Sequence, residues 1–229
     1  MAELRSHGEA NIKKILLKHG VKEPFFGVKV EYLKLIQKKI KMDYQLAKDL
    51  YATGNADAMY LAGLIADDEK MTRSDLQTWV RQAVSPNISE YTVPWVATGS
   101  NYGYELALEW IDAKKEHIAA AGWSTLTNWV SAKPDAELDL PSLKALLSRV
   151  EKNIHGSENR VRSTMNSFII GLGSYVTALT TDALATAKKI GAVTVDKEGT
   201  ACKVPDATVY IKKVKDKGNL GKKKKTVKC

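Results

Sequence analysis

The sequence predicts an all-α protein, and two observations carry that prediction. Apolar side chains recur with the helical period of about 3.6 residues, and almost no segment alternates apolar and polar residues as a strand does. The periodic runs also have helix start and stop signals: Asp43 precedes a run that ends at Gly54, and Thr72 or Ser74 precedes one that ends at Ser85. With 44% hydrophobic and 27% charged residues, the 229-residue chain can bury a sizeable core.

The periodic runs fall into six successive pairs, which repeat at roughly 30 to 45 residues. The pairs are 9–19 with 30–41, 43–53 with 56–67, 73–84 with 88–97, 102–112 with 115–131, 141–152 with 159–179, and 181–190 with 205–216. This spacing without a rigid consensus favours degenerate HEAT-like helical hairpins stacked into a right-handed superhelix, an α-solenoid. A compact orthogonal bundle would give a similar pattern and stays the alternative. The stretch 193–204 interrupts the periodicity and is expected to be an ordered loop or a two-strand excursion.

The charge is unevenly distributed along the chain. Residues 1–41 hold ten Lys or Arg and four Glu, residues 42–211 hold sixteen basic and twenty-one acidic residues, and residues 212–229 hold nine Lys and one Asp. We therefore divide the chain into one helical-repeat domain, residues 1–211, and a lysine-rich basic tail, residues 212–229. Two positive regions flanking an acidic middle can hold a polyanion between them, or can be solvated surfaces that only aid solubility.

Several classes of protein do not fit the sequence. No apolar run reaches the roughly 18 residues of a membrane helix, and the N-terminus lacks the apolar core of a secretory signal, so we expect a cytoplasmic protein. The four histidines lie in no metal-ligand spacing, and no phosphate-cradling glycine loop or nucleophile elbow occurs. We expect no metal, no cofactor and a monomer, with Cys202 and Cys229 as free thiols.

Aromatic residues gather in a segment that glycine and proline interrupt. Tyr91 and Trp95 lie in this segment, which contains Pro94 and Gly99. Aromatic side chains there are less easily explained as core than those at regular helical spacing. An exposed Trp95 would suit stacking on a base or a sugar, and a core position is the alternative.

Two arginines begin the helix predicted from residue 159. Arg160 and Arg162 point to different faces of that helix, so at most one of them faces a concave groove. A phosphate contact is the functional interpretation, and an ion pair with Glu151 or Glu158 is the structural one.

Four motifs, taken in order, resemble the AlkD-type DNA alkylation repair proteins, in a divergent branch. The motifs are Pro24–Val30, Tyr91–Trp95, Glu158–Arg162 and Cys202–Ala207, and the similarity covers most of residues 9–214. The resemblance implies a superhelix of HEAT-like repeats whose concave basic surface holds duplex DNA. It also implies glycosylase chemistry on cationic alkylated purines, as in the family's characterised members.

The family's catalytic cleft, as the resemblance implies it, uses two tryptophans, an aspartate and a nearby arginine. Trp95 matches the first tryptophan, but Gly99 occupies the aspartate position and Ser167 lies near the place of the second tryptophan. The stretch 119–122, where the arginine is expected, reads Ala-Ala-Ala-Gly. A glycine cannot stabilise the sugar cation that develops as a base leaves, so the match indicates an inherited fold without inherited catalysis. Glu90 or Glu105 would be the substitute carboxylate if activity remains.

The first functional hypothesis is therefore a DNA-binding helical-repeat protein related to the alkylated-base glycosylases. It contacts double-stranded DNA mainly through phosphates. The predicted contact residues are Lys13, Lys14, Lys34, Lys38, Lys41, Tyr91, Trp95, Arg160 and Arg162, with the tail lysines. A second hypothesis is base excision with a displaced carboxylate. The third is a non-catalytic HEAT-repeat scaffold that binds a basic protein partner through the acidic middle of the chain.

Overall fold

Helical hairpins follow one another along the chain, as the sequence predicts. The computed structural model describes residues 1–196 and 204–229, and in these residues it has thirteen α-helices and no β-strand. The helices are α1 Ala2–Ser6, α2 Ala10–Lys18, α3 Val30–Ile40, α4 Tyr44–Ala52, α5 Ala56–Ile65, α6 Arg73–Gln82, α7 Val93–Gly99, α8 Gly103–Trp110, α9 Glu116–Ala132, α10 Leu140–Asn153, α11 Asn159–Tyr175, α12 Thr180–Ile190 and α13 Ala207–Asp216. All twelve predicted runs are helical, and the periodicity missed only the short α1.

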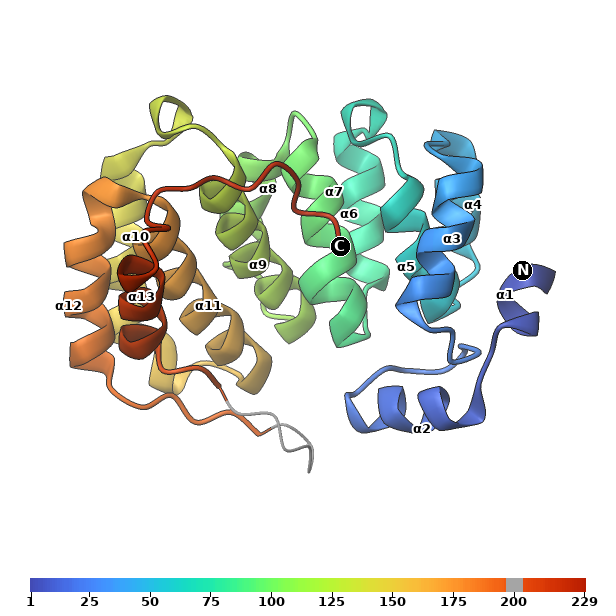
Figure 1. Ribbon diagram of the computed structural model, residues 1–229, viewed down its shortest axis with the longest axis horizontal. Coiled ribbons are helices and arrows are strands. Elements are labelled where there is room, and N and C mark those ends of the chain that lie inside the picture. Colours follow the sequence, from blue (N-terminus) through green and yellow to red (C-terminus); the bar gives the residue numbers. More distant parts are fainter. Residues whose placement is uncertain (197–203) are drawn as a thin grey trace.

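The hairpins stack into a curved array (Figure 1). One row consists of α5, α7, α9 and α11, each packed against the next. Helix α4 packs against α5, α8 against α9, and α12 against α11. We call α5, α7, α9 and α11 the inner row. This arrangement is the stacked architecture that the repeat spacing favoured over a compact orthogonal bundle, because each hairpin buries its apolar face against its neighbours.

The helix starts use the caps that the sequence indicated. The Asp43 carboxylate accepts a hydrogen bond from the backbone N–H of Leu46, 2.9 Å away, at the start of α4. Thr72 rather than Ser74 caps α6, in a reciprocal capping box with Asp75. These bonds satisfy N–H groups that have no partner inside the helix.

The loop of the first motif is held by a buried carboxylate. The Asp57 side chain accepts hydrogen bonds from the backbone N–H groups of Phe26, Gly27 and Val28 at 2.6, 2.9 and 3.3 Å. Gly27 has φ +84°, and a Cβ there would lie 2.6 Å from the backbone nitrogen of Lys13, so only glycine fits. The loop is thereby fixed between α2 and α5.

The aromatic segment begins with a π-helix, Ile88–Thr92, that continues into α7. The backbone N–H of Val93 bonds to the carbonyl of Ile88, five residues earlier. Pro94 has no N–H to donate to the carbonyl of Glu90, which favours the wider turn. The widened turn therefore precedes the helix that carries Trp95.

The last helix crosses the expected division at residue 211. Helix α13 runs through to Asp216, so the first five residues of the predicted tail belong to the last helix. The interruption predicted at 193–204 lies largely outside the described residues, as does Cys202, and residues 193–196 have no regular structure. Across the described ranges, no single helix is long and apolar enough to cross a membrane; α11 with residues 177–190 meets the criteria only as a pair bent by 115°.

Candidate nucleic-acid interface

Trp95 lies in α7 between two tyrosine rings. The Tyr60 ring meets the indole edge-on at 5.2 Å between centroids, and the Tyr91 ring lies at 6.2 Å. The indole is 5% exposed, whereas Tyr91 is 53% exposed. Tyr91, and not Trp95, therefore provides the exposed aromatic surface. Tyr91 lies in the π-helix and is turned outward, whereas Trp95 lies in α7, which packs into the inner row.

A partly buried ion pair lies next to these rings. The Arg160 guanidinium binds both oxygens of Glu90, with Nε 2.5 Å from Oε1 and Nη2 2.7 Å from Oε2. Burial opposes the charge on Arg160, but the hydrogen bonds and the negative charge of Glu90 outweigh it and raise the pKa of the guanidinium. The partner is thus Glu90 of the π-helix, and the interpretation that paired Arg160 with Glu151 or Glu158 was wrong about the partner.

The ion pair closes one side of a polar cavity of about 320 Å³ between α7, α9 and α11. Trp95 and Tyr91 line this cavity, together with Ser124, Thr127, Ser163 and Ser167. Ser167 lines this cavity together with Trp95 and contributes a hydroxyl group to it. The cavity suits hydrogen bonding to a polar group rather than sandwiching a flat base between two rings.

On the other side of Trp95, a carboxylate fills the space beside Gly99. A Cβ on Gly99 would overlap the Asp68 side chain, so any larger residue at position 99 requires Asp68 to move. Burial raises the pKa of Asp68 to about 6, against the opposing charge of Lys228, whose ammonium lies 2.7 Å from Oδ1. An acid therefore lines the same cleft as Trp95, contributed by the segment after α5 and not by α7.

The two glutamates considered as substitute acids are both engaged elsewhere. Glu90 is bound to Arg160, and Glu105 on α8 pairs with Arg73 of α6. Neither has the position relative to Gly99 that Asp68 has. Sequence reasoning missed Asp68 because it lies 31 residues before Gly99 and carries no motif of its own.

The predicted phosphate-contacting lysines lie on the first helices. Lys13 binds Glu23 at 2.8 Å and sits over the Phe25 ring, so its charge is partly neutralised. Within the described residues no ion pair is formed by the others, which are Lys14 of α2, Lys34 and Lys38 of α3 and Lys41 just after it. Lys14, Lys38 and Lys41 are exposed and Lys34 is half-buried, so these four ammonium groups stay available to an anion.

Arg162 does not line the cavity beside Trp95. It is half-buried on a different face of α11 from Arg160, as the helical geometry predicted. The structure therefore brings Tyr91, Trp95 and Arg160 together and leaves Arg162 and the lysines of α2 and α3 outside this cluster.

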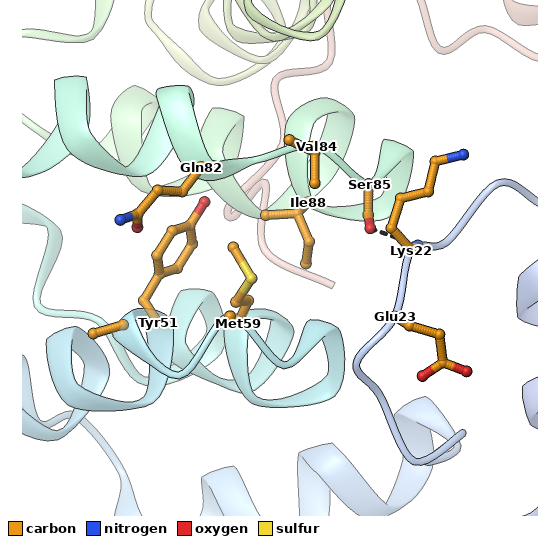
Figure 2. Close-up of a pocket in the computed structure, with 10 residues that line it drawn as sticks. Lys22, Glu23, Tyr51, Met59, Gln82, Val84, Ser85 and Ile88 are labelled. Carbon is orange, nitrogen blue, oxygen red and sulfur yellow. Dashed lines mark hydrogen bonds between the residues drawn. The ribbon is translucent and has the colours of Figure 1, made fainter.

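A separate pocket lies between the α2–α3 connection, α4, α5 and the end of α6 (Figure 2). Its volume is about 280 Å³, and Tyr51, Met59 and Ile88 form an apolar surface inside it. The backbone N–H of Lys22 donates to Ser85 Oγ at 2.8 Å and ties the connection to the end of α6. Because the lining offers no acid–base pair beyond the exposed ends of Lys22 and Glu23, we interpret this pocket as a packing gap.

Comparisons with known proteins fit this architecture. The profile of the DNA alkylation repair enzyme family matches residues 1–211. This chain belongs to that family. Lin0241 of Listeria innocua is 31% identical over 223 residues, 95% of this chain and 96% of that protein, and Lmo0209 of Listeria monocytogenes is 31% identical over 221 residues, 94% and 95% of the two chains.

A solved structure shares the whole fold of this family member, with a TM-score of 0.92 and 36% sequence identity over 100% of this chain and 97% of the other. That protein is described as one of a new family related to the HEAT-like repeat DNA glycosylases with affinity for branched DNA structures. The predicted HEAT-like fold and the divergent position in the alkylation repair family are confirmed. In the described parts of the chain, no three His, Cys, Asp or Glu side chains gather as a metal site.

Proposed function

We propose that this protein binds DNA, with preference for branched structures, through phosphate contacts made by its basic helices. The observation that carries the proposal is the fold shared over the full chain with a protein that has affinity for branched DNA. Lys14 of α2 and Lys34 and Lys38 of α3, which pair with no carboxylate of the described residues, support it, since such ammonium groups can replace the counterions of a phosphate backbone.

The polar cavity beside Trp95 supports binding rather than base capture. Its aromatic and hydroxyl groups suit a strand that splays away from a helical stack, as strands do at a branch point. Tyr91, which is half exposed, provides the ring on which such an unpaired base can stack.

Titration of the full-length protein into labelled four-way junction and linear duplex of matched length, at two salt concentrations, tests the proposal. We expect tighter binding to the junction, and an affinity that falls steeply as salt rises. Equal binding to junction and duplex would remove the preference for branches, and the absence of binding at low salt would remove the DNA function.

A second candidate function is base excision, and the position of Asp68 favours it. Its carboxylate fills the space beside Gly99 and next to Trp95, where a negative charge stabilises a developing sugar cation. The Lys228 ammonium would compete for this carboxylate, so any activity is expected to be weak.

A base-release assay on methylated duplex separates this candidate from simple binding. Asp68→Asn should abolish release, whereas Glu105→Gln, which alters an exposed carboxylate paired with Arg73, should leave it unchanged. If the wild-type protein releases no base, the candidate is withdrawn and the binding function stands unaffected.

A further inference from the structure

The residues after α13 form an ordered strap across the ends of other helices. We call residues 219–229 the strap; Figure 1 shows it leaving α13 and crossing to the middle of the molecule. The backbone N–H of Gly221 donates to the carbonyl of Ser174 in α11 at 2.9 Å, and that of Lys224 donates to Ser131 in α9 at 2.8 Å. At its far end, the Lys228 ammonium donates to the carbonyl of Ala66, which follows α5, at 2.9 Å.

These contacts have a common physical cause. The last carbonyls of a helix have no partner within it and carry the negative end of the helix dipole. The strap satisfies such carbonyls on α9 and α11 and directly after α5, and Lys223 adds a 2.8 Å bond to the carbonyl of Val130 together with an ion pair to Asp135. The strap is therefore fixed in place by the inner row.

Docking uses only some of the strap lysines. Lys223 and Lys228 bind carbonyls and carboxylates, but Lys224 and Lys225 are exposed and form no ion pair with any described residue. Lys133, at the end of α9, is placed over the Trp129 ring at 4.7 Å, and Lys224 lies over Tyr175 at 5.5 Å. Aromatic rings position these ammonium groups without neutralising them.

Three lysines that form no ion pair with a described residue border one cleft. Lys133, Lys224 and Lys225 line a cavity of about 480 Å³ between the strap, α7 and α9, and Trp95 and Thr98 also line it. Four lysines and two carboxylates line the cleft altogether, and one of those carboxylates, Asp68, is already paired with Lys228. The cleft therefore carries an excess of positive charge, unlike the cavity on the other side of Trp95, where Glu90 and Arg160 balance each other.

We propose that the strap and Lys133 form a second phosphate-binding surface, which holds a nucleic-acid strand along the edge of the inner row. From Lys222 to Lys228 an extended chain spans at most roughly 20 Å, which matches about six nucleotides at the rise of a B-form strand. Such a length suits a strand rather than a single small anion. This inference rests on the proposed DNA-binding function and adds a contact surface to it, separate from the lysines of α2 and α3.

The test compares two triple variants with the same change of charge. Lys133→Gln, Lys224→Gln and Lys225→Gln together alter the cleft but keep Lys223 and Lys228, which dock the strap. As the control, Lys114→Gln, Lys152→Gln and Lys188→Gln together remove three exposed lysines, which lie in the α8–α9 connection, in α10 and in α12, respectively. Both proteins should melt as the wild type does.

The expected results concern the affinity for a four-way junction. The cleft variant should bind about tenfold more weakly at 0.1 M salt, and the slope of log affinity against log salt should be shallower by about 2 to 3, roughly one unit for each phosphate that no longer has an ammonium partner. The control variant should change affinity less than about twofold. Equal behaviour of the two variants would overturn the inference while leaving DNA binding intact, whereas a wild type without affinity for DNA would remove both proposals.

Discussion

The basic N-terminal helices and the basic C-terminal region carry comparable excess charge and use it in different ways. Lys14 of α2, Lys38 of α3 and Lys41 just after α3 are exposed and have no carboxylate partner among the described residues. In the C-terminal strap, Lys223 and Lys228 instead bind helix carbonyls and acids of the fold. The comparison shows that a lysine-rich segment can bind the rest of the fold instead of remaining solvated, and that net charge alone does not distinguish these two cases.

The largest effect should come from deleting the strap, residues 219–229. The deletion removes partners of carbonyls in α9 and α11 and after α5, as well as the packing of Val227, so we expect a loss of about 4 kcal/mol in the free energy of unfolding, since hydrogen bonds to charged groups contribute about 1.5–3 kcal/mol each. Urea titration of the truncated and full-length proteins measures it. A truncated protein as stable as the full chain would mean that the strap is merely a solvated arm.

The next effect is a pH dependence of stability that arises at Asp68, the carboxylate that Lys228 of the strap contacts. Burial raises the pKa of Asp68 to about 6, above the value of about 3.9 in an unfolded chain. Asp68 therefore keeps its proton up to a higher pH in the folded state than in the unfolded state. The stability that this protonated carboxyl contributes is present at about pH 4 and below, and it is lost as pH rises through about 6. Asp68→Asn, which cannot ionise, should escape this loss.

The measurable quantity is the difference in unfolding free energy between wild type and Asp68→Asn at pH 4 and at pH 7. We expect the variant to gain stability relative to the wild type by about 2 kcal/mol as pH rises. This figure takes about 1.36 kcal/mol for each unit of pKa shift and is reduced because Asp68 is partly exposed. A difference that stays constant between the two pH values would contradict the raised pKa.

A smaller effect is expected when the N-terminal lysines are changed together. Replacing Lys14, Lys34, Lys38 and Lys41 by Gln should weaken junction binding about tenfold and reduce its salt dependence, because a protein that neutralises fewer phosphates releases fewer counterions. Stability should change little, since none of the four forms an ion pair in the part of the chain that the structure describes. Binding isotherms measure the affinity, and thermal melts measure the stability. A variant that is destabilised but binds normally would show that these N-terminal lysines stabilise the fold instead of binding DNA.

The smallest effect separates two adjacent lysines of α2. Lys13 binds Glu23 and covers Phe25, so Lys13→Gln should mainly lower stability, and only slightly, as is usual for an exposed ion pair. Lys14→Gln should mainly weaken DNA binding, about twofold to threefold, without affecting the melt. Identical effects of the two substitutions on binding would show that the ion pair with Glu23 opens when DNA binds.

The helices were predictable because their information is local. Periodicity placed twelve of the thirteen α-helices of the described residues, and caps such as Asp43 and Thr72 act within one turn of the helix they start. The site was only partly predictable. Tyr91 and Trp95 were placed in the right segment, but the π-helix that exposes Tyr91 and buries Trp95 depends on how α7 packs.

The amino-acid sequence by itself determined the all-helical class, the hairpin spacing and the family, because each of these rests on residues close together in the chain. Tertiary structure alone decided that Glu90 neutralises Arg160, that Asp68 occupies the space beside Gly99, and that the lysine tail fastens the inner row. These contacts join residues 31 to 162 positions apart, and several of them end on backbone carbonyls, which every residue has and no sequence pattern marks.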